Sequence, residues 1–206
     1  MKYNFLFIHI PRCGGTSMST ALTAAFPQCF IGCDNIKHVR ARYLRRLIGE
    51  DLWKKAYKFA LIRSPWEIIE SYWRHTTAAY DNIEFISHDS FWYSHVYEVH
   101  SYSGFDEYVE RQYLTDPNIN LREKCGFWQT FCMEDTNEDL GVIPVLTTRA
   151  ADFFDGLCHL YHATPSFAYP HLNGANAPMG IWSKNLKERV GERCAYDTRR
   201  FGWTCM

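Results

Sequence analysis

The chain of 206 residues is 47% hydrophobic and 22% charged, as in an ordinary globular protein with a sizeable core. Its formal net charge of −1 argues against general nucleic-acid binding, because that function needs a strongly basic face. We therefore expect one domain over residues 1–206, in which any anion-binding site is local.

In chain order the expected elements are a strand over 3–10, a helix over 16–26, a helix from about Lys37 to Ile48, a strand over 57–62, a helix from Pro65, short helices and loops over 82–113, a strand over 142–147, a helix near 151–161, a Pro/Gly/Asn-rich loop over 164–180 and a helix over 183–201. Asp34 or Asn35 is the expected cap of the second helix, and Gly49 is its expected stop. Strands that alternate with helices indicate an α/β fold with a parallel sheet flanked by helices.

Eight cysteines do not predict a disulfide framework, because no CxxC pair occurs and the chain is too long to need covalent staples. Cys29, Cys33 and His38 could form part of a metal site, but no second ligand pair accompanies them. The simplest interpretation is that the eight cysteines are reduced thiols in a protein of a reducing compartment. Since no apolar stretch approaches the ~20 residues of a membrane-spanning helix, we expect a cytoplasmic protein without a membrane span.

The stretch FIHIPRCGGTSMST, residues 7–20, leads from a strand through a glycine pair into a helix. Such a junction presents backbone N–H groups and the positive end of a helix dipole to an anion. Gly14 and Gly15 allow close approach of the backbone, and Thr16 and Ser17 add hydroxyl donors. The lysine of the nucleotide-triphosphate loop G-x-x-x-x-G-K-[ST] is not in its place, however. A glycine turn that only caps a helix is the alternative interpretation.

A second motif, FALIRSPWEIIESYW over residues 59–73, repeats the strand-to-helix arrangement. Arg63 follows the strand, and Ser71 lies eight residues later on the expected helix. Eight helical residues rise ~12 Å, so the spacing alone does not bring the two side chains to one group. Arg63 could equally be a surface charge, and Ser71 could bond to its own helical turn.

Together, FIHIPRCGGTS and RSPWEIIESYW resemble the paired binding motifs of sulfotransferases that use 3′-phosphoadenosine 5′-phosphosulfate (PAPS). The resemblance is closest to the branch that contains heparan sulfate 2-O-sulfotransferase and small bacterial relatives. It implies a three-layer, P-loop-like fold and a PAPS donor, with no metal required. It places donor binding on Arg12, Cys13, Gly14, Gly15, Thr16 and Ser17 for the 5′-phosphosulfate, on Arg63 and Ser71 for the 3′-phosphate, and on Asn173 of the late loop PHLNGAN.

Two departures from the family pattern stand out. Arg12 occupies the position where the family usually has lysine, and the third strand is followed by TTRAAD without the acidic residue that the family often places there. Weaker similarity covers KHVRARYLRRLIGEDLWKKAYKFALIRSPW and the YDTRRFGW ending.

The expected reaction is in-line transfer of a sulfuryl group to an acceptor hydroxyl, most simply on a carbohydrate. Arg12 would stabilise the charge that grows on the bridging oxygen, without donating a proton. His38 is the expected general base, because a position at a helix N-terminus would keep its ring neutral and the resembled branch has a histidine between the motifs. An exposed histidine in a basic helix is the alternative, and Glu67, Glu70, His95 and His100 are reserve candidates.

Other features have two interpretations each. His171 and Asn173 could contact the donor or only shape a loop, and the aromatic residues of 91–102 could stack on an acceptor or fill a core. Two other functions stay open: a P-loop nucleotide kinase, which needs a loop lysine and a magnesium-binding acid, and a non-catalytic nucleotide-binding protein. The acceptor and the oligomeric state are not determined by the sequence.

Overall fold

The computed structural model describes residues 5–27, 38–80, 91–115, 128–134, 136, 138–165, 168–170 and 179–205. Two compact units are present. The first combines Met1–Arg63 with Gly126–Asn173, and the second combines Ser64–Cys125 with Gly174–Met206. No helix among the described residues is both long enough and apolar enough to cross a membrane.

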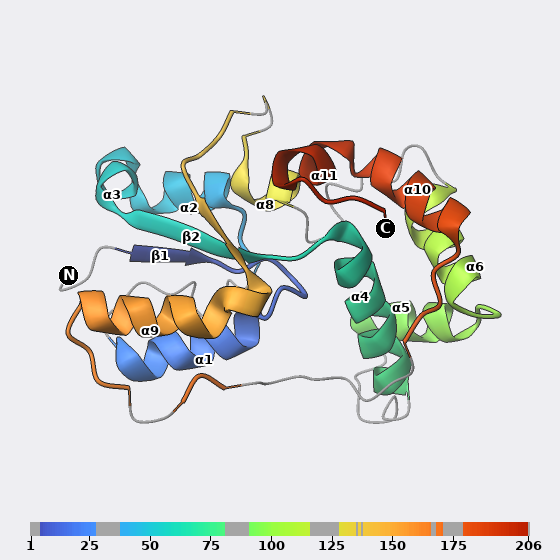
Figure 1. Cartoon of the computed structure of the whole chain (residues 1–206), viewed down its shortest axis with the longest axis horizontal. Helices are drawn as coiled ribbons and strands as arrows, with labels where there is room; N and C mark the ends of the chain where they lie inside the picture. The colour runs from blue at the N-terminus through green and yellow to red at the C-terminus, as the bar shows by residue number, and fades with distance from the viewer. Residues whose placement is uncertain are drawn as a thin grey trace. The chain divides into compact units, whose positions relative to one another are not determined.

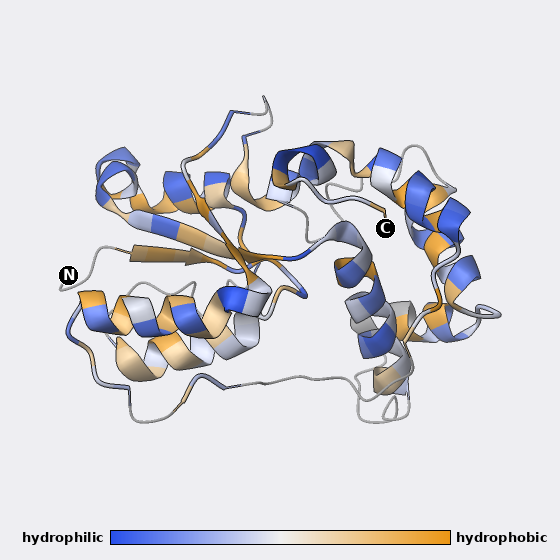
Figure 2. Cartoon of the chain, in the orientation of Figure 1, coloured by the Kyte–Doolittle hydropathy of each residue, from blue (hydrophilic) through white to orange (hydrophobic). Residues whose placement is uncertain are grey.

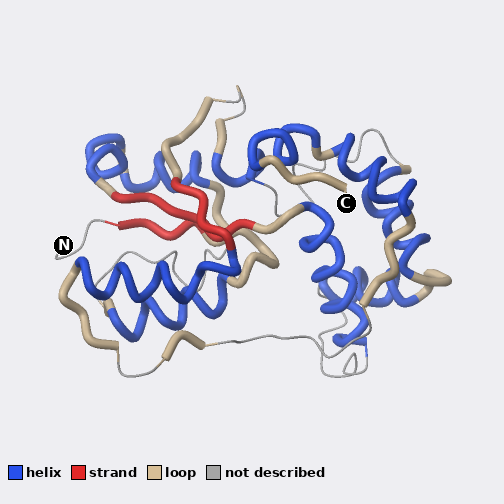
Figure 3. Tube along the Cα trace, in the orientation of Figure 1, coloured by secondary structure: helices blue, strands red, loops and turns tan. Residues whose placement is uncertain are grey.

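The first unit contains a parallel sheet of three described strands in the order β1-β2-β3 (Figures 1 and 3). The strands are β1 (Phe5–Ile8), β2 (Tyr57–Ile62) and β3 (Ile143–Leu146). In register, Ile8 pairs with Ala60, and Ile62 pairs with Leu146. Because all three strands run the same way, their carboxyl ends share one edge of the sheet.

Helices cover both faces of this sheet, so the expected α/β class with a flanked parallel sheet is confirmed. On one face α1 (Gly15–Ala25) packs beside α9 (Ala150–Leu160), as Figure 1 shows. On the other face lie α2 (Ala41–Ile48) and α3 (Glu50–Lys55), and α2 also packs against α8 (Trp128–Cys132). A 3₁₀ turn, η4 (Thr147–Arg149), joins β3 to α9.

Apolar strands explain why the core of this unit sits along β1 and the later part of β2, where orange predominates in Figure 2. All four residues of β1 and the last four of β2 are buried, as expected for strands covered on both faces. Phe5 packs edge-on against Phe26, with ring centroids 5.1 Å apart, and lies tilted against Phe59 at 6.4 Å. These contacts tie α1 and the strands into one core.

The described residues of the second unit form helices joined by turns and loops, with no strand among them. Its elements are α4 (Pro65–Tyr80), α5 (Phe91–His100), α6 (Phe105–Val109), the π-helical turn η3 (Glu110–Leu114), α10 (Lys184–Arg193) and α11 (Ala195–Phe201). Helix α4 packs against α5, α6 and α10. Trp73 of α4 contacts Phe105 and Tyr108 with centroids 5.9 and 5.2 Å away, so aromatic side chains build this core.

Several boundaries differ from the sequence-based expectations. The expected C-terminal helix is two helices, capped by Ser183 and broken at Cys194. Helices α3 and α8 were not expected, whereas Gly49, with φ of 84°, ends α2 as predicted. The expected caps Asp34 and Asn35 lie outside the described residues, as do Cys29, Cys33, His171 and Asn173.

Candidate functional site

The turn between β1 and α1 has the backbone geometry of an anion-binding loop. Arg12 has φ of 62° and Gly14 has φ of 79°, so left-handed residues lie on both sides of Cys13. Alternation of this kind directs successive N–H groups towards one side, and the resulting concavity suits an anion. A Cβ at Gly14 would be strained by this φ and would also lie 3.2 Å from Cγ2 of Thr147.

Helix α1 strengthens the positive potential at this turn. Gly14 is its N-cap and has no side chain with which to cap the first N–H groups. The first turn contains no acidic residue that would compete for them. Gly15 and Ser17 are buried and Thr16 is half-buried, so the expected loop residues line a compact helix start. The arrangement favours an anionic ligand over a cation.

Thr147 ties this loop to the carboxyl ends of the other strands. Its hydroxyl lies 3.0 Å from the carbonyl oxygen of Cys13 and 3.0 Å from that of Ile62. A hydroxyl has one proton, so the two carbonyls share it. Thr147 was not expected to take part in the site. It occupies the position after the third strand, where the resembled family often has an acid.

His9 is a second residue that sequence reasoning missed. It follows β1 directly, and its carbonyl oxygen lies 3.1 Å from Nδ1 of His38. The two imidazole rings meet edge to face, with centroids 4.4 Å apart. His9 also packs on the glycine loop, because a Cβ at Gly15 would lie closer than 3.0 Å to three atoms of its ring. The structure thus brings His38 to the loop through His9.

The expected place of His38 at the start of a helix is wrong. Helix α2 begins at Ala41 with Arg40 as its N-cap, and His38 lies before it with φ of 68°. A left-handed residue cannot continue an α-helix, so the helix starts after it. The helix dipole therefore does not account for a neutral ring. The hydrogen bond to the His9 carbonyl is a contact that orients His38.

Arg63 follows β2, at the same edge of the sheet as the glycine loop. Its positive charge affects the phenol of Tyr169, which stands directly before PHLNGAN, residues 170–176, the expected donor loop. Burial raises the pKa of the Tyr169 phenol to about 12, and the charge of Arg63 partly opposes this shift. Tyr169 was not expected, although an aromatic residue beside PHLNGAN was a visible signal.

Ser71 belongs to the second unit, where it is half-buried on α4. The start of α4 is a capping box, since the Glu67 carboxylate accepts bonds from the backbone N–H and the hydroxyl of Ser64, at 3.0 and 2.7 Å. Glu67 thus has a structural role, which weakens it as a reserve base. His100 likewise stacks on Tyr80, with centroids 3.3 Å apart. The side chain of His95 lies outside the described residues.

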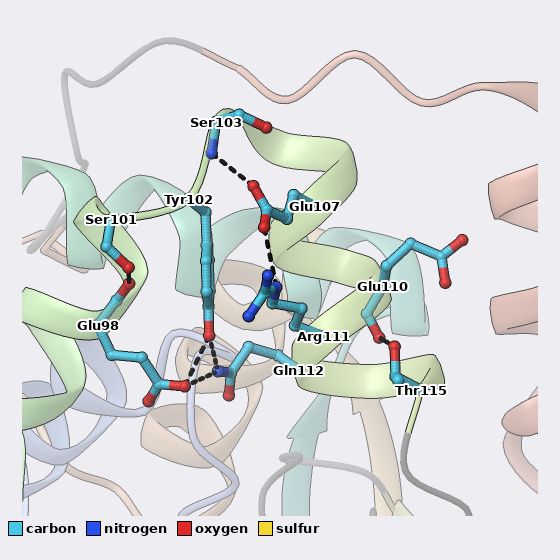
Figure 4. Close-up of polar contacts among 9 residues, drawn as sticks. All are labelled: Glu98, Ser101, Tyr102, Ser103, Glu107, Glu110, Arg111, Gln112 and Thr115. Atoms are coloured by element: carbon cyan, nitrogen blue, oxygen red, sulfur yellow. Dashed lines mark hydrogen bonds and ion pairs between the residues drawn. The ribbon is translucent and has the colours of Figure 1, made fainter.

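A polar network joins α5 to the π-helical turn within the second unit (Figure 4). The Tyr102 hydroxyl donates to Glu98 at 2.7 Å and accepts from Gln112 at 2.7 Å, while Gln112 also donates to Glu98. The pKa of Tyr102 is raised to about 12, mainly by desolvation and to a smaller extent by the hydrogen bond to Glu98. Arg111 pairs with Glu107 and lies over the Tyr102 ring. The network is internally satisfied, which indicates a structural role.

Among the described residues, no group of three or more His, Cys, Asp or Glu side chains is arranged to hold a metal ion. No protein-family model, curated protein or solved structure matches this chain.

Proposed function

We propose that the protein is a PAPS-dependent sulfotransferase with a P-loop-like fold that transfers a sulfuryl group to an acceptor hydroxyl, most simply that of a carbohydrate. The observation that carries this proposal is the loop at residues 12–14, whose left-handed backbone precedes a helix with no acidic residue in its first turn. Arg63 at the end of the neighbouring strand supplies a second positive charge. The resemblance of both motifs to sulfotransferase motifs supports the same assignment.

Arg12 and the loop N–H groups would act on the 5′-phosphosulfate of the donor. In the transfer, a bond forms between the acceptor oxygen and sulfur while the bond from sulfur to the bridging phosphate oxygen breaks. The electron pair of that bond stays on the nucleotide, which leaves as 3′-phosphoadenosine 5′-phosphate (PAP). Arg12 stabilises this charge electrostatically, since a guanidinium keeps its proton.

His38 would accept the proton that the acceptor hydroxyl loses. A carbonyl oxygen only accepts hydrogen bonds, so the contact with His9 requires the proton on Nδ1 of His38. In the neutral ring, Nε2 is then the basic nitrogen. A fixed base with a defined tautomer is the arrangement that proton transfer from a hydroxyl requires.

The test is calorimetry with PAP and with ATP on the wild-type chain and on Arg63→Ala. We expect PAP to bind more tightly than ATP, and Arg63→Ala to weaken PAP binding by at least tenfold, because a charged hydrogen-bonding partner is lost. Lys54→Ala is the matched control, since it removes an exposed positive charge on α3 of the same unit. Equal loss in both variants would mean that only net charge matters, and would contradict the assignment.

Activity assays then distinguish the sulfotransferase from the two other candidate functions, a nucleotide kinase and a non-catalytic binding protein. Transfer of labelled sulfate from PAPS to sugars, unaffected by a chelator, supports the sulfotransferase. Phosphoryl transfer that stops on chelation would identify a nucleotide kinase instead. Tight PAP binding without turnover on a panel of sugars, phenols and lipids would identify a non-catalytic binding protein.

A further inference from the structure

The ring of His9 lies between the two parts of the candidate catalytic site. One side of it occupies the space next to Gly15, at the start of α1, and His38 meets it edge to face. Phe7 stacks on it with centroids 5.7 Å apart and an angle of 25° between the rings. His9 follows β1 in a tight turn, in which the N–H of Ile10 bonds to the carbonyl of Ile8 at 3.1 Å. Three neighbours thus hold the ring of His9.

We propose that His9 is a positioning residue that sets both the place and the tautomer of His38, and that Gly15 is required to make room for its ring. This inference rests on the proposed function, in which His38 is the base. In such an arrangement a neighbouring group orients the catalytic base. A hydrogen bond to that group fixes one ring nitrogen of the histidine, so that the other nitrogen can accept a proton. For His38, the group that orients the base is the backbone carbonyl of His9.

The backbone of His38 shows why such support is needed. Its φ of 68° is in the left-handed region, which a non-glycine residue adopts at a cost and keeps only when neighbours determine it. His9 supplies two such restraints on His38, through its carbonyl oxygen and through its ring. Losing the ring would remove one of these restraints and allow the imidazole to turn.

The role of Gly15 follows from the same ring. An alanine at position 15 of a helix's first turn would normally be favourable. Here its Cβ would overlap Cδ2, Nε2 and Cγ of His9. Gly15→Ala should therefore displace His9, and it should do so only while the ring is present.

The first experiment reads the tautomer of His38 directly. Two-dimensional ¹⁵N–¹H spectra of the histidine rings, assigned by comparison with His38→Ala, should show His38 with its proton on Nδ1 in the wild-type chain. Both His9→Ala and His9→Phe keep the backbone carbonyl. His9→Ala removes the ring that holds the His38 imidazole against this carbonyl and should therefore reduce that tautomer, whereas His9→Phe, which keeps a ring, should preserve it. His162→Asn is the control, because His162 is another left-handed histidine of the same unit and should not affect His38. A wild-type His38 protonated on Nε2, or one unchanged in His9→Ala, overturns the proposal.

The second experiment uses stability and turnover. Gly15→Ala should lower the melting temperature of the wild-type chain but not that of His9→Ala; equal losses in both backgrounds overturn the role of Gly15. In sulfate transfer, His9→Ala should lower kcat about 10–100-fold with PAP affinity unchanged, as for residues that orient a reactive group, and His9→Phe should recover most of it. Unchanged kcat in His9→Ala overturns the positioning role.

The two proposals fail differently. If the chain binds no PAP or transfers no sulfate, the sulfotransferase assignment is wrong, yet the tautomer and the Gly15–His9 coupling can still be measured. If sulfate transfer is found but His9→Ala leaves the His38 tautomer unchanged, only the role of His9 is wrong.

Discussion

Three non-glycine residues of the described chain have a left-handed backbone: Arg12, His38 and His162. His162 has an ordinary explanation, because it follows α9, where the N–H of Ala163 bonds back to the carbonyl of Cys158 at 2.8 Å and ends the helix. Arg12 and His38 end no helix. A left-handed residue costs ~1–3 kcal/mol and tends to persist at functional sites. The two candidate catalytic residues thus share a strained backbone.

Substitutions at position 12 distinguish the effect of the arginine side chain on activity from the effect of the left-handed backbone. Arg12→Ala should lower kcat about 10²–10³-fold, because a group that stabilises developing charge is lost, and Arg12→Lys should stay active. Arg12→Gly removes the backbone strain as well as the guanidinium, so it should be as inactive as Arg12→Ala. Steady-state rates with PAPS measure all three. Activity restored in Arg12→Gly would show that the backbone, and not the charge, is what matters.

At the scale of elements, the site is built where three parallel strands end. The glycine loop follows β1, Arg63 follows β2 and Thr147 follows β3. Carboxyl ends of parallel strands are the usual place for ligands in α/β folds. The hydroxyl of Thr147 connects all three ends, since it reaches the carbonyls of Cys13 and Ile62. The loop is therefore held by the sheet and not only by α1.

Thr147→Val tests this connection, because it keeps the shape of the side chain and removes the hydroxyl. We expect a loss of ~1–3 kcal/mol in unfolding free energy from the two carbonyls left without this partner, measured by urea denaturation, together with weaker PAP binding. Thr147→Ser keeps the hydroxyl and should retain PAP affinity. Thr23→Val is the control: Thr23 is exposed and bonds to the carbonyl of Ser19 within its own helix α1, so the change should stay within ~0.5 kcal/mol. Equal effects at Thr23 and Thr147 would contradict the special role of Thr147.

The sequence predicted what depends on local pattern and missed what depends on tertiary contacts. Apolar runs located all three strands of the described residues, β2 with both ends correct, and Pro65 marked the start of α4. The start of α2 was wrong, because a left-handed His38 is not visible in helical periodicity. His9, Thr147 and Tyr169 were missed, since each joins the site through a residue at least six positions away in the chain. The donor-binding roles of the loop residues, Arg63, Ser71 and Asn173 stay predictions.

At the scale of the whole molecule, both units are discontinuous in sequence. The chain leaves the first unit after Arg63, returns at Gly126 and leaves it again after Asn173. Each unit has its own core: strands and helices around Phe5 and Phe59 in the first, and aromatic helices around Tyr108 in the second. Whether they unfold as one domain over residues 1–206, as the sequence predicts, is open to a direct test.

Thermal unfolding with PAP tests the single domain and the donor together. A ligand at 100 times its Kd adds ~2.7 kcal/mol of stability, and for a chain of this size each kcal/mol raises Tm by about 2–4 °C. One transition that PAP raises by roughly 5–10 °C is therefore expected. Arg63→Ala should lose the shift at the same PAP concentration, and Lys54→Ala should keep it. Two transitions, of which PAP moves only one, would show that the units unfold independently and that donor binding stabilises just one of them.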